Sequence, residues 1–197
     1  MLTNQQFEKA AALLKCTVAH IKTVYEVESA GSAYLADGRV KILFEGHRFW
    51  KNILKTGINP SKFAAKYPNV IYSIWDRKQY KGGTKEWDRM SQAITACKEM
   101  GIPAEVALDS ASYGSFQIMG ENSKECGYDT AQQMLTSYNT GGEEEQLNSF
   151  CKLLINRGLD SALRNGQWAT FARGYNGTGY RENKYDIKLA TVFKKNS

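Results

Sequence analysis

Apolar residues recur along most of the chain at spacings of three and four, which is the pattern of helices that bury one face. Capping residues, prolines and glycines mark where these helices begin and end. The predicted helices span residues 4–15, 17–29, 45–55, 84–100, 103–109, 130–138, 143–157, 168–174 and 183–193, with a short further helix opening at 60. Asp129 is the expected cap of the helix at 130–138, and Gly31 is the expected stop of the helix at 17–29.

Only one short segment is expected to form a strand. Residues 40–44 (VKILF) are an apolar, partly β-branched run that follows an Asp-Gly turn. Residues 73–83 (SIWDRKQYKGG) are polar, aromatic and irregular, and we expect a loop that faces solvent or substrate. The face expected to be buried in the helix at 84–100 carries Trp87, Met90, Ile94 and Cys97. The chain is therefore predicted to be mainly α, with at most a small β element.

The charge balance narrows the choice of partner. The chain has 197 residues, which suits a single domain, and its 26 basic and 20 acidic side chains give a net charge of +6. A positive surface favours an anionic partner such as nucleic acid, a membrane surface or a bacterial cell-wall polymer. The basic residues are scattered, so a nucleic-acid partner receives little support. No segment approaches the roughly 20 apolar residues of a spanning helix, and the first residues do not form a secretory signal.

The cysteine pattern favours buried free thiols. Cys16, Cys97, Cys126 and Cys151 are scattered, without a CxxC pair or a histidine at the spacing of metal ligands. The sequence also contains no phosphate-binding glycine loop and no Ser-His-Asp arrangement. We therefore expect no disulfide framework, no metal site and no other cofactor.

One carboxylate falls on the apolar face of the helix at 17–29. Glu28 follows Val24 and Tyr25 at spacings of four and three, whereas Glu26 projects toward solvent. Burial disfavours a charged carboxylate, and the last turn of a helix adds the negative end of its dipole. Both effects raise the pKa, and a carboxyl group that keeps its proton near neutral pH suits a general acid. The alternative is a glutamate at a fraying helix end, or one paired with a cation such as Arg39.

Two later stretches have the composition of a ligand cleft. Residues 110–122 (SASYGSFQIMGEN) make a turn of small residues that leads to Gln117, whose amide both donates and accepts hydrogen bonds. Residues 171–180 (FARGYNGTGY) break a helix at Asn176 and two glycines, beside two tyrosines of which Tyr180 is the second. Amides beside flat aromatic rings suit a sugar, so Tyr180 is also predicted to contact substrate.

Taken in order, these stretches carry a family resemblance. The pair Glu28-Ser29, the segment 113–119 (YGSFQIM) and the segment 175–177 (YNG) resemble the three-motif signature of lytic transglycosylases and goose-type lysozymes. More closely, VESAGSAYLADGRVKILFEGHRFW, ASYGSFQIMG and YNGTGY are similar to the N-acetylmuramidase domain of phage endolysins. The resemblance implies a lysozyme-like fold, and a single catalytic domain over 1–197 without a separate cell-wall-binding module.

The resemblance also implies roles for individual residues. Glu28 matches the glutamate that protonates the glycosidic oxygen between N-acetylmuramic acid and N-acetylglucosamine. Gln117 matches the glutamine of the cleft wall, and Tyr175 with Asn176 matches the tyrosine-asparagine element near the acid. Ser29 matches the serine that follows the acid, a small residue that is expected to shape the helix end rather than to perform chemistry.

Glycosidases generally use a second carboxylate, about 5–5.5 Å away for retention of configuration and about 6.5–9.5 Å for inversion. Glu45, Asp37 and Asp109 are the candidates, and Glu45 is favoured because it lies beside His47 after an apolar run. Asp37 precedes a glycine and suits a tight turn. Asp109 is expected either to point into the cleft or to cap the next segment. His47 is expected either to contact substrate in the active site or to form a structural pair with Glu45.

Three functions remain open at this point. The first is a muramidase acting on bacterial peptidoglycan, and the second is a lytic transglycosylase that leaves a 1,6-anhydro product. The third is a non-catalytic basic module that binds cell wall or nucleic acid. For the first, we expect a monomer that is made in the host cytoplasm and reaches the periplasmic wall after the membrane is permeabilised, without stable insertion into the membrane.

Overall fold

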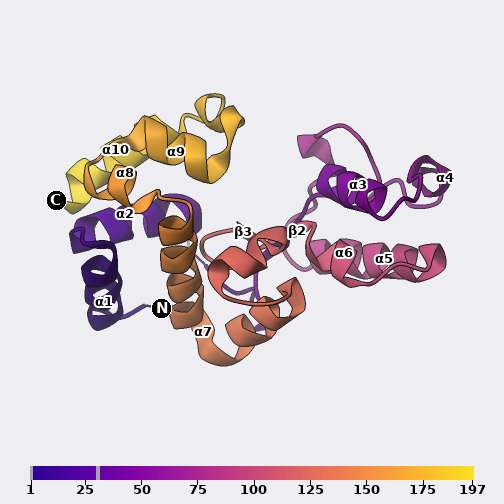
Figure 1. The fold of residues 1–197 in the computed structure, drawn as a ribbon, viewed down its shortest axis with the longest axis horizontal. Helices are drawn as coiled ribbons and strands as arrows, with labels where there is room; N and C mark the ends of the chain where they lie inside the picture. The colour runs from indigo at the N-terminus through magenta and orange to yellow at the C-terminus, as the bar shows by residue number, and fades with distance from the viewer. Residues whose placement is uncertain (1, 30–31) are drawn as a thin grey trace.

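The computed structural model describes residues 2–29 and 32–197, and this part of the chain is mainly helical with one small sheet (Figure 1). The α-helices are α1 (Asn4–Leu14), α2 (Val18–Ser29), α3 (Gly46–Lys55), α4 (Ser61–Ala64), α5 (Lys85–Met100), α6 (Glu105–Leu108), α7 (Ala131–Asn156), α8 (Asp160–Arg164), α9 (Trp168–Asn176) and α10 (Tyr185–Asn196). The strands are β1 (Ile42–Phe44), β2 (Ala111–Tyr113) and β3 (Ile118–Met119), and the 3-10 helices are η1 (Arg77–Gln79), η2 (Gly120–Cys126) and η3 (Thr178–Arg181). The predicted mainly α class is confirmed. Within these ranges no helix combines the length and the apolar character needed to cross a membrane.

Most helices begin and end within a few residues of their predicted limits. Thr3 caps α1 through a reciprocal capping box. Helix α2 ends at Ser29, whereas Gly31, the expected stop, lies outside the described residues. The expected cap of α7 is wrong by one residue, because the side chain of Thr130 accepts a hydrogen bond from the third residue of the helix and Asp129 does not.

The segments predicted as separate helices at 130–138 and 143–157 form one kinked helix. Gly142 interrupts α7 with φ 70° and ψ −156°, a conformation that glycine adopts without steric cost. The carboxylates after the kink are tied to the N-terminal helices, since the Tyr25 hydroxyl donates to Glu143 at 2.7 Å and the Gln6 amide donates to Glu144 at 3.0 Å. Helix α7 packs on α1, and the Tyr25–Glu143 hydrogen bond joins it to α2 directly after the kink.

The sheet is antiparallel in the order β1-β2-β3, with Ile42 opposite Tyr113 and Ser112 opposite Met119. Directly after β1, the Glu45 backbone N–H donates to the Ser110 carbonyl at 2.9 Å. This pairing joins Glu45 to the residue that directly precedes β2, which lies far from it in sequence.

The elements form two groups of helices with the sheet region between them. In Figure 1, α1, α2, α8, α9 and α10 lie on one side, α3 to α6 lie on the other, and β2, β3 and α7 lie between. Helix α10 packs on α2 and α9, and α5 packs on α6 and β1. The apolar core continues through both groups, and it contains large buried side chains such as Phe44, Phe116, Tyr138 and Phe171.

The buried face of α5 differs from the predicted one. Ile94 is 36% exposed, whereas Glu86 and Arg89 are buried together with Met90 and Cys97. The physical reason is that Glu86 and Arg89 satisfy backbone groups of the neighbouring chain, as described below. Three of the four thiols are buried as predicted, and Cys16 is partly buried.

Candidate active site

A cavity of about 320 Å³ is lined by residues of the sheet region and of the group of helices that contains α2, α9 and α10. Helices α2, α7, α9 and α10 and all three strands contribute to its walls. The lining residues are Glu28, Leu43, Glu45, Ser112, Gln117, Ile118, Met119, Asn122, Leu153, Arg157, Tyr175, Asn176 and Tyr185. The fold thus brings together five of the residues singled out in the sequence, namely Glu28, Glu45, Gln117, Tyr175 and Asn176.

Glu28 lies in the last turn of α2, partly buried at the cavity. Burial raises the pKa of its carboxyl group to about 7, although the hydrogen bond from Asn176 and the charge of Lys188 lower it. The Asn176 Nδ2 donates to Glu28 Oε1 at 3.1 Å. Glu28 can therefore hold a proton near neutral pH, and its side chain lines the cavity.

The other acids near Glu28 in sequence have separate partners. Glu26 is exposed and accepts from Lys195 Nζ at 3.0 Å, as its outward position predicted. Arg39 forms its ion pair with Asp37 at 2.7 Å in an exposed turn. The alternative pairing of Glu28 with Arg39 is therefore wrong, and Asp37 is the turn residue that its Asp-Gly pair predicted.

Tyr175 and Asn176 are held at the end of α9. The Tyr175 hydroxyl donates to the Phe116 carbonyl at 2.8 Å, and its ring stacks on Phe171 with centroids 5.6 Å apart. This packing fixes the position from which the next residue reaches Glu28. The Asn176 Oδ1 is buried without a hydrogen-bond partner among the described residues, so the amide holds an unused acceptor beside the acid.

Gln117 is positioned by the turn between β2 and β3. Its Oε1 accepts from the Ser112 hydroxyl at 2.9 Å and its Nε2 donates to the Gly114 carbonyl at 2.8 Å. Gly114 has φ 71°, and a Cβ there would lie 2.3 Å from Oε1 of Gln146, so the turn requires glycine. The predicted small-residue turn thus exists, and it places Gln117 on the cavity wall.

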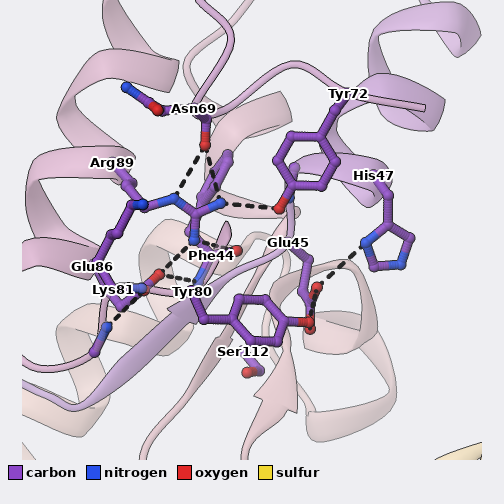
Figure 2. A network of polar contacts seen from close by, with 12 residues as sticks. Phe44, Glu45, His47, Asn69, Tyr72, Tyr80, Lys81, Glu86, Arg89 and Ser112 are labelled. Atoms are coloured by element: carbon purple, nitrogen blue, oxygen red, sulfur yellow. Dashed lines mark hydrogen bonds and ion pairs between the residues drawn. The ribbon is translucent and has the colours of Figure 1, made fainter. Parts of the chain in front are cut away.

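Glu45 lies between β1 and α3, on the same cavity as Glu28. Figure 2 shows its carboxylate facing both His47 and Tyr80. The Tyr80 hydroxyl donates to Glu45 Oε2 at 2.7 Å, with Oε1 at 2.9 Å, and His47 Nδ1 lies 3.2 Å from Oε2. Burial and the Glu45 charge raise the pKa of Tyr80 well above its ordinary range, so this hydroxyl remains a donor.

A buried ion pair supports this part of the site (Figure 2). Arg89 donates to Glu86 at 2.7 Å, to the Phe44 carbonyl at 2.8 Å and to the Tyr72 hydroxyl at 2.9 Å. Glu86 also accepts from the backbone N–H groups of Phe44, Lys81 and Gly82 at 3.1, 2.6 and 3.0 Å. The pair therefore connects Phe44 at the end of β1 and Lys81, which follows Tyr80, to helix α5.

Tyr180, Asp109 and His47 are sequence candidates that lie off the cavity lining. Tyr180 is buried, and its hydroxyl accepts from Arg181 Nε at 3.0 Å. Asp109 is partly buried, and burial together with the charge of Glu105 raises its pKa to about 6. Ser29 is the last residue of α2. His47 contacts Glu45 rather than the cavity itself.

Several cavity and support residues were not singled out from the sequence, among them Tyr185, Arg157 and Tyr80. Tyr185 and Arg157 line the cavity, and Tyr80 holds Glu45. Only Tyr80 had a signal, since it belongs to the aromatic loop expected to face solvent or substrate. Across residues 2–29 and 32–197, His, Cys, Asp and Glu side chains form no group of three placed to hold a metal ion.

Comparisons with known proteins identify a matching family and a similar solved structure. The family described as N-acetylmuramidase matches residues 17–197. Among solved structures, the crystal structure of the endolysin of Burkholderia AP3 phage is similar, with a TM-score of 0.84 and 34% sequence identity. The similarity covers 99% of this chain and 71% of that chain. The comparison with curated proteins finds no match.

Proposed function

The chain belongs to the N-acetylmuramidase family, and on this premise we propose that it cleaves the β-1,4 bond between N-acetylmuramic acid and N-acetylglucosamine with Glu28 as the general acid. The family and the endolysin fold identify the chain as a glycosidase of the peptidoglycan-hydrolase type. Membership of this enzyme family argues against the third function considered above, a non-catalytic binding module. The observation that supports Glu28 as the acid is its place on the cavity lining beside Asn176, where burial raises its pKa to about 7. The choice of bond rests on the family.

In the proposed reaction the Glu28 proton passes to the glycosidic oxygen as the bond from that oxygen to C1 of N-acetylmuramic acid breaks. The hydroxyl of a water molecule joins C1, and the second proton of that water passes to Glu45. The Tyr80 hydroxyl holds the Glu45 carboxylate at the cavity, and His47 Nδ1 lies 3.2 Å from the same carboxylate. Asn176 and Tyr175 fix the proton donor, and Gln117 offers a polar edge to the sugar.

A lytic transglycosylase would use the same acid with the 6-hydroxyl of the sugar as nucleophile. The presence of a second carboxylate, Glu45, on the cavity lining favours hydrolysis. The overall charge of +6 suits an anionic wall polymer, and the expected setting is that of a phage endolysin. In this setting the protein is made in the host cytoplasm and meets the wall after the membrane is permeabilised.

The test is the chemistry of the released ends. Purified peptidoglycan is digested, the products are reduced with borohydride, and the muropeptides are identified by mass spectrometry. We expect products that contain one added water and end in reduced N-acetylmuramic acid. Predominant 1,6-anhydro ends would show transglycosylation instead, and reduced N-acetylglucosamine ends would show cleavage of the other glycosidic bond.

A further inference from the structure

The loop between Tyr72 and Tyr80 exposes two large apolar side chains. Ile74 is 78% exposed and Trp75 is 53% exposed, which are high values for side chains of this size. They line a shallow hollow of about 470 Å³, together with Tyr72, Ser73, Asp76 and Gln79. Scattered apolar residues are ordinary on protein surfaces, whereas two adjacent ones in a hollow mark a contact surface.

Trp75 is connected to the cavity by hydrogen bonds. Its indole Nε1 donates to the Tyr80 hydroxyl oxygen at 2.8 Å, and that hydroxyl donates to the Glu45 carboxylate. One side chain therefore separates the exposed indole from a cavity-lining acid. Because the N–H already has a partner, the exposed part of Trp75 offers mainly the apolar surface of its ring.

The loop is a fixed element. Asp76 caps η1 by accepting from the Lys78 N–H at 2.9 Å. Beyond the loop, the N–H groups of Lys81 and Gly82 are held by the buried Glu86, as Figure 2 shows for Lys81. A surface held by such bonds can present an aromatic ring in one orientation, which reduces the entropy lost when a ligand binds.

The charge of the loop residue Arg77 acts on a residue of the cavity wall. Burial and the charge of Glu28 raise the pKa of the cavity residue Tyr185, and the positive charge of Arg77 partly offsets this rise. Arg77, Lys78 and Lys81 are exposed on or beside the loop. A polymer that leaves the cavity on this side therefore meets an indole ring and three cations.

We propose that residues 73–80 are a saccharide platform that extends the cleft, on which Trp75 stacks against a sugar ring of the glycan strand away from the cleaved bond. The occupant is the substrate strand itself, because hydrogen bonds of Tyr80 with Trp75 and Glu45 join the platform to the cavity lining and because its cations match the carboxylates of peptidoglycan. The inference rests on the proposed function, since it names a further part of the same substrate site.

The test compares glycans of different length. Binding of peptide-free N-acetylglucosamine–N-acetylmuramic acid oligomers, short (tetrasaccharide) and long, is measured by calorimetry in a Glu28→Gln background. The variants are Trp75→Ala, Trp75→Phe and, as a matched exposed apolar control on α1, Leu13→Ala. We expect Trp75→Ala to raise Kd for long strands about tenfold with little change for the tetrasaccharide, and Trp75→Phe to recover most of the affinity.

Kinetic measurements distinguish two roles for Trp75, namely binding of the glycan strand and support of Glu45 through Tyr80. In the enzyme with Glu28 intact, Trp75→Ala is expected to raise KM for long strands with kcat retained, whereas Tyr80→Phe is expected to lower kcat. Unchanged binding in Trp75→Ala, equal losses at all strand lengths, or a fall in kcat alone would each overturn the platform. Failure of the proposed function is seen separately, as the wrong product ends or as activity that survives Glu28→Gln.

Discussion

The side chain of Asn176 donates from Nδ2 to Oε1 of Glu28 over 3.1 Å, which joins the end of α9 to the last turn of α2. These residues are 148 positions apart in the sequence. The contact fixes the carboxyl group that we assign as the proton donor, in a cavity where burial raises its pKa to about 7. The predictions below follow from this group and from the elements that support it.

The first prediction concerns pH. Only the protonated form of Glu28 can donate, so kcat/KM is expected to fall as pH rises through about 7. The measurement is a pH–rate profile with soluble peptidoglycan fragments at constant ionic strength. A rate that stays level from pH 6 to about pH 9 would contradict the role of a group with this pKa.

The second prediction concerns Lys188, whose positive charge lowers the pKa of Glu28. Lys188→Gln removes this charge, so the alkaline limb of the pH–rate profile is expected to move to higher pH. Lys188→Arg keeps the charge and is the matched control, with a profile close to that of the parent enzyme. A shift to lower pH in Lys188→Gln, or equal shifts in both variants, would show that the charge does not act on the acid.

The third prediction concerns stability. The folded-state pKa of Glu28 lies above its unfolded value, so the protonated carboxyl is favoured in the folded protein and stability falls as pH rises from about 4.5 to about 7. Glu28→Gln has no proton to lose. We expect its unfolding free energy to exceed that of the parent by about 1–3 kcal/mol at pH 8, with a smaller difference at pH 4. Urea denaturation at both pH values measures this, and an equal difference at the two would contradict it.

The fourth prediction concerns the buried pair Glu86 and Arg89, whose side chains are 0% and 3% exposed. Burial alone would raise the pKa of Glu86, but its backbone N–H partners and Arg89 hold it below the usual range. Glu86→Gln leaves the Arg89 charge without its counterion, so a loss of about 3–5 kcal/mol in unfolding free energy is expected. Removing both charges with Glu86→Gln and Arg89→Met is expected to cost less than the sum of the two single changes. Additive losses in this double-mutant cycle would argue against the pair.

Much of the fold could be predicted from the sequence, because helix periodicity and capping residues are local patterns. Helix periodicity placed most helices, and the same spacing distinguished the inward Glu28 from the outward Glu26. The exceptions have two different origins. Thr130 and Asp129 are both good caps, so the local sequence does not choose between them. On α5 the apolar spacing predicted that Ile94 is buried. Glu86 and Arg89 are buried instead, because these charges bind backbone groups distant in sequence.

The sequence predicted the candidate site only in part. The motifs named the acid, the glutamine and the tyrosine-asparagine pair, and these do line one cavity. Tyr80 was not singled out, because its bond to Glu45 spans 35 positions of the chain and depends on how the loop is fastened by α5. Tyr180 belongs to a motif segment yet is turned into the core, since η3 directs its ring inward. Local patterns do not report such long-range placements.

The central claim is that Glu28 supplies the proton, and its most direct test is the rate at which muropeptides are released from purified peptidoglycan by Glu28→Gln. The matched control is Glu26→Gln, two positions earlier on the exposed face of α2. We expect Glu28→Gln to lose about 10²–10⁴-fold in rate while it still binds the wall, and Glu26→Gln to keep the parent rate. Release by Glu28→Gln within a few-fold of the parent would contradict the account.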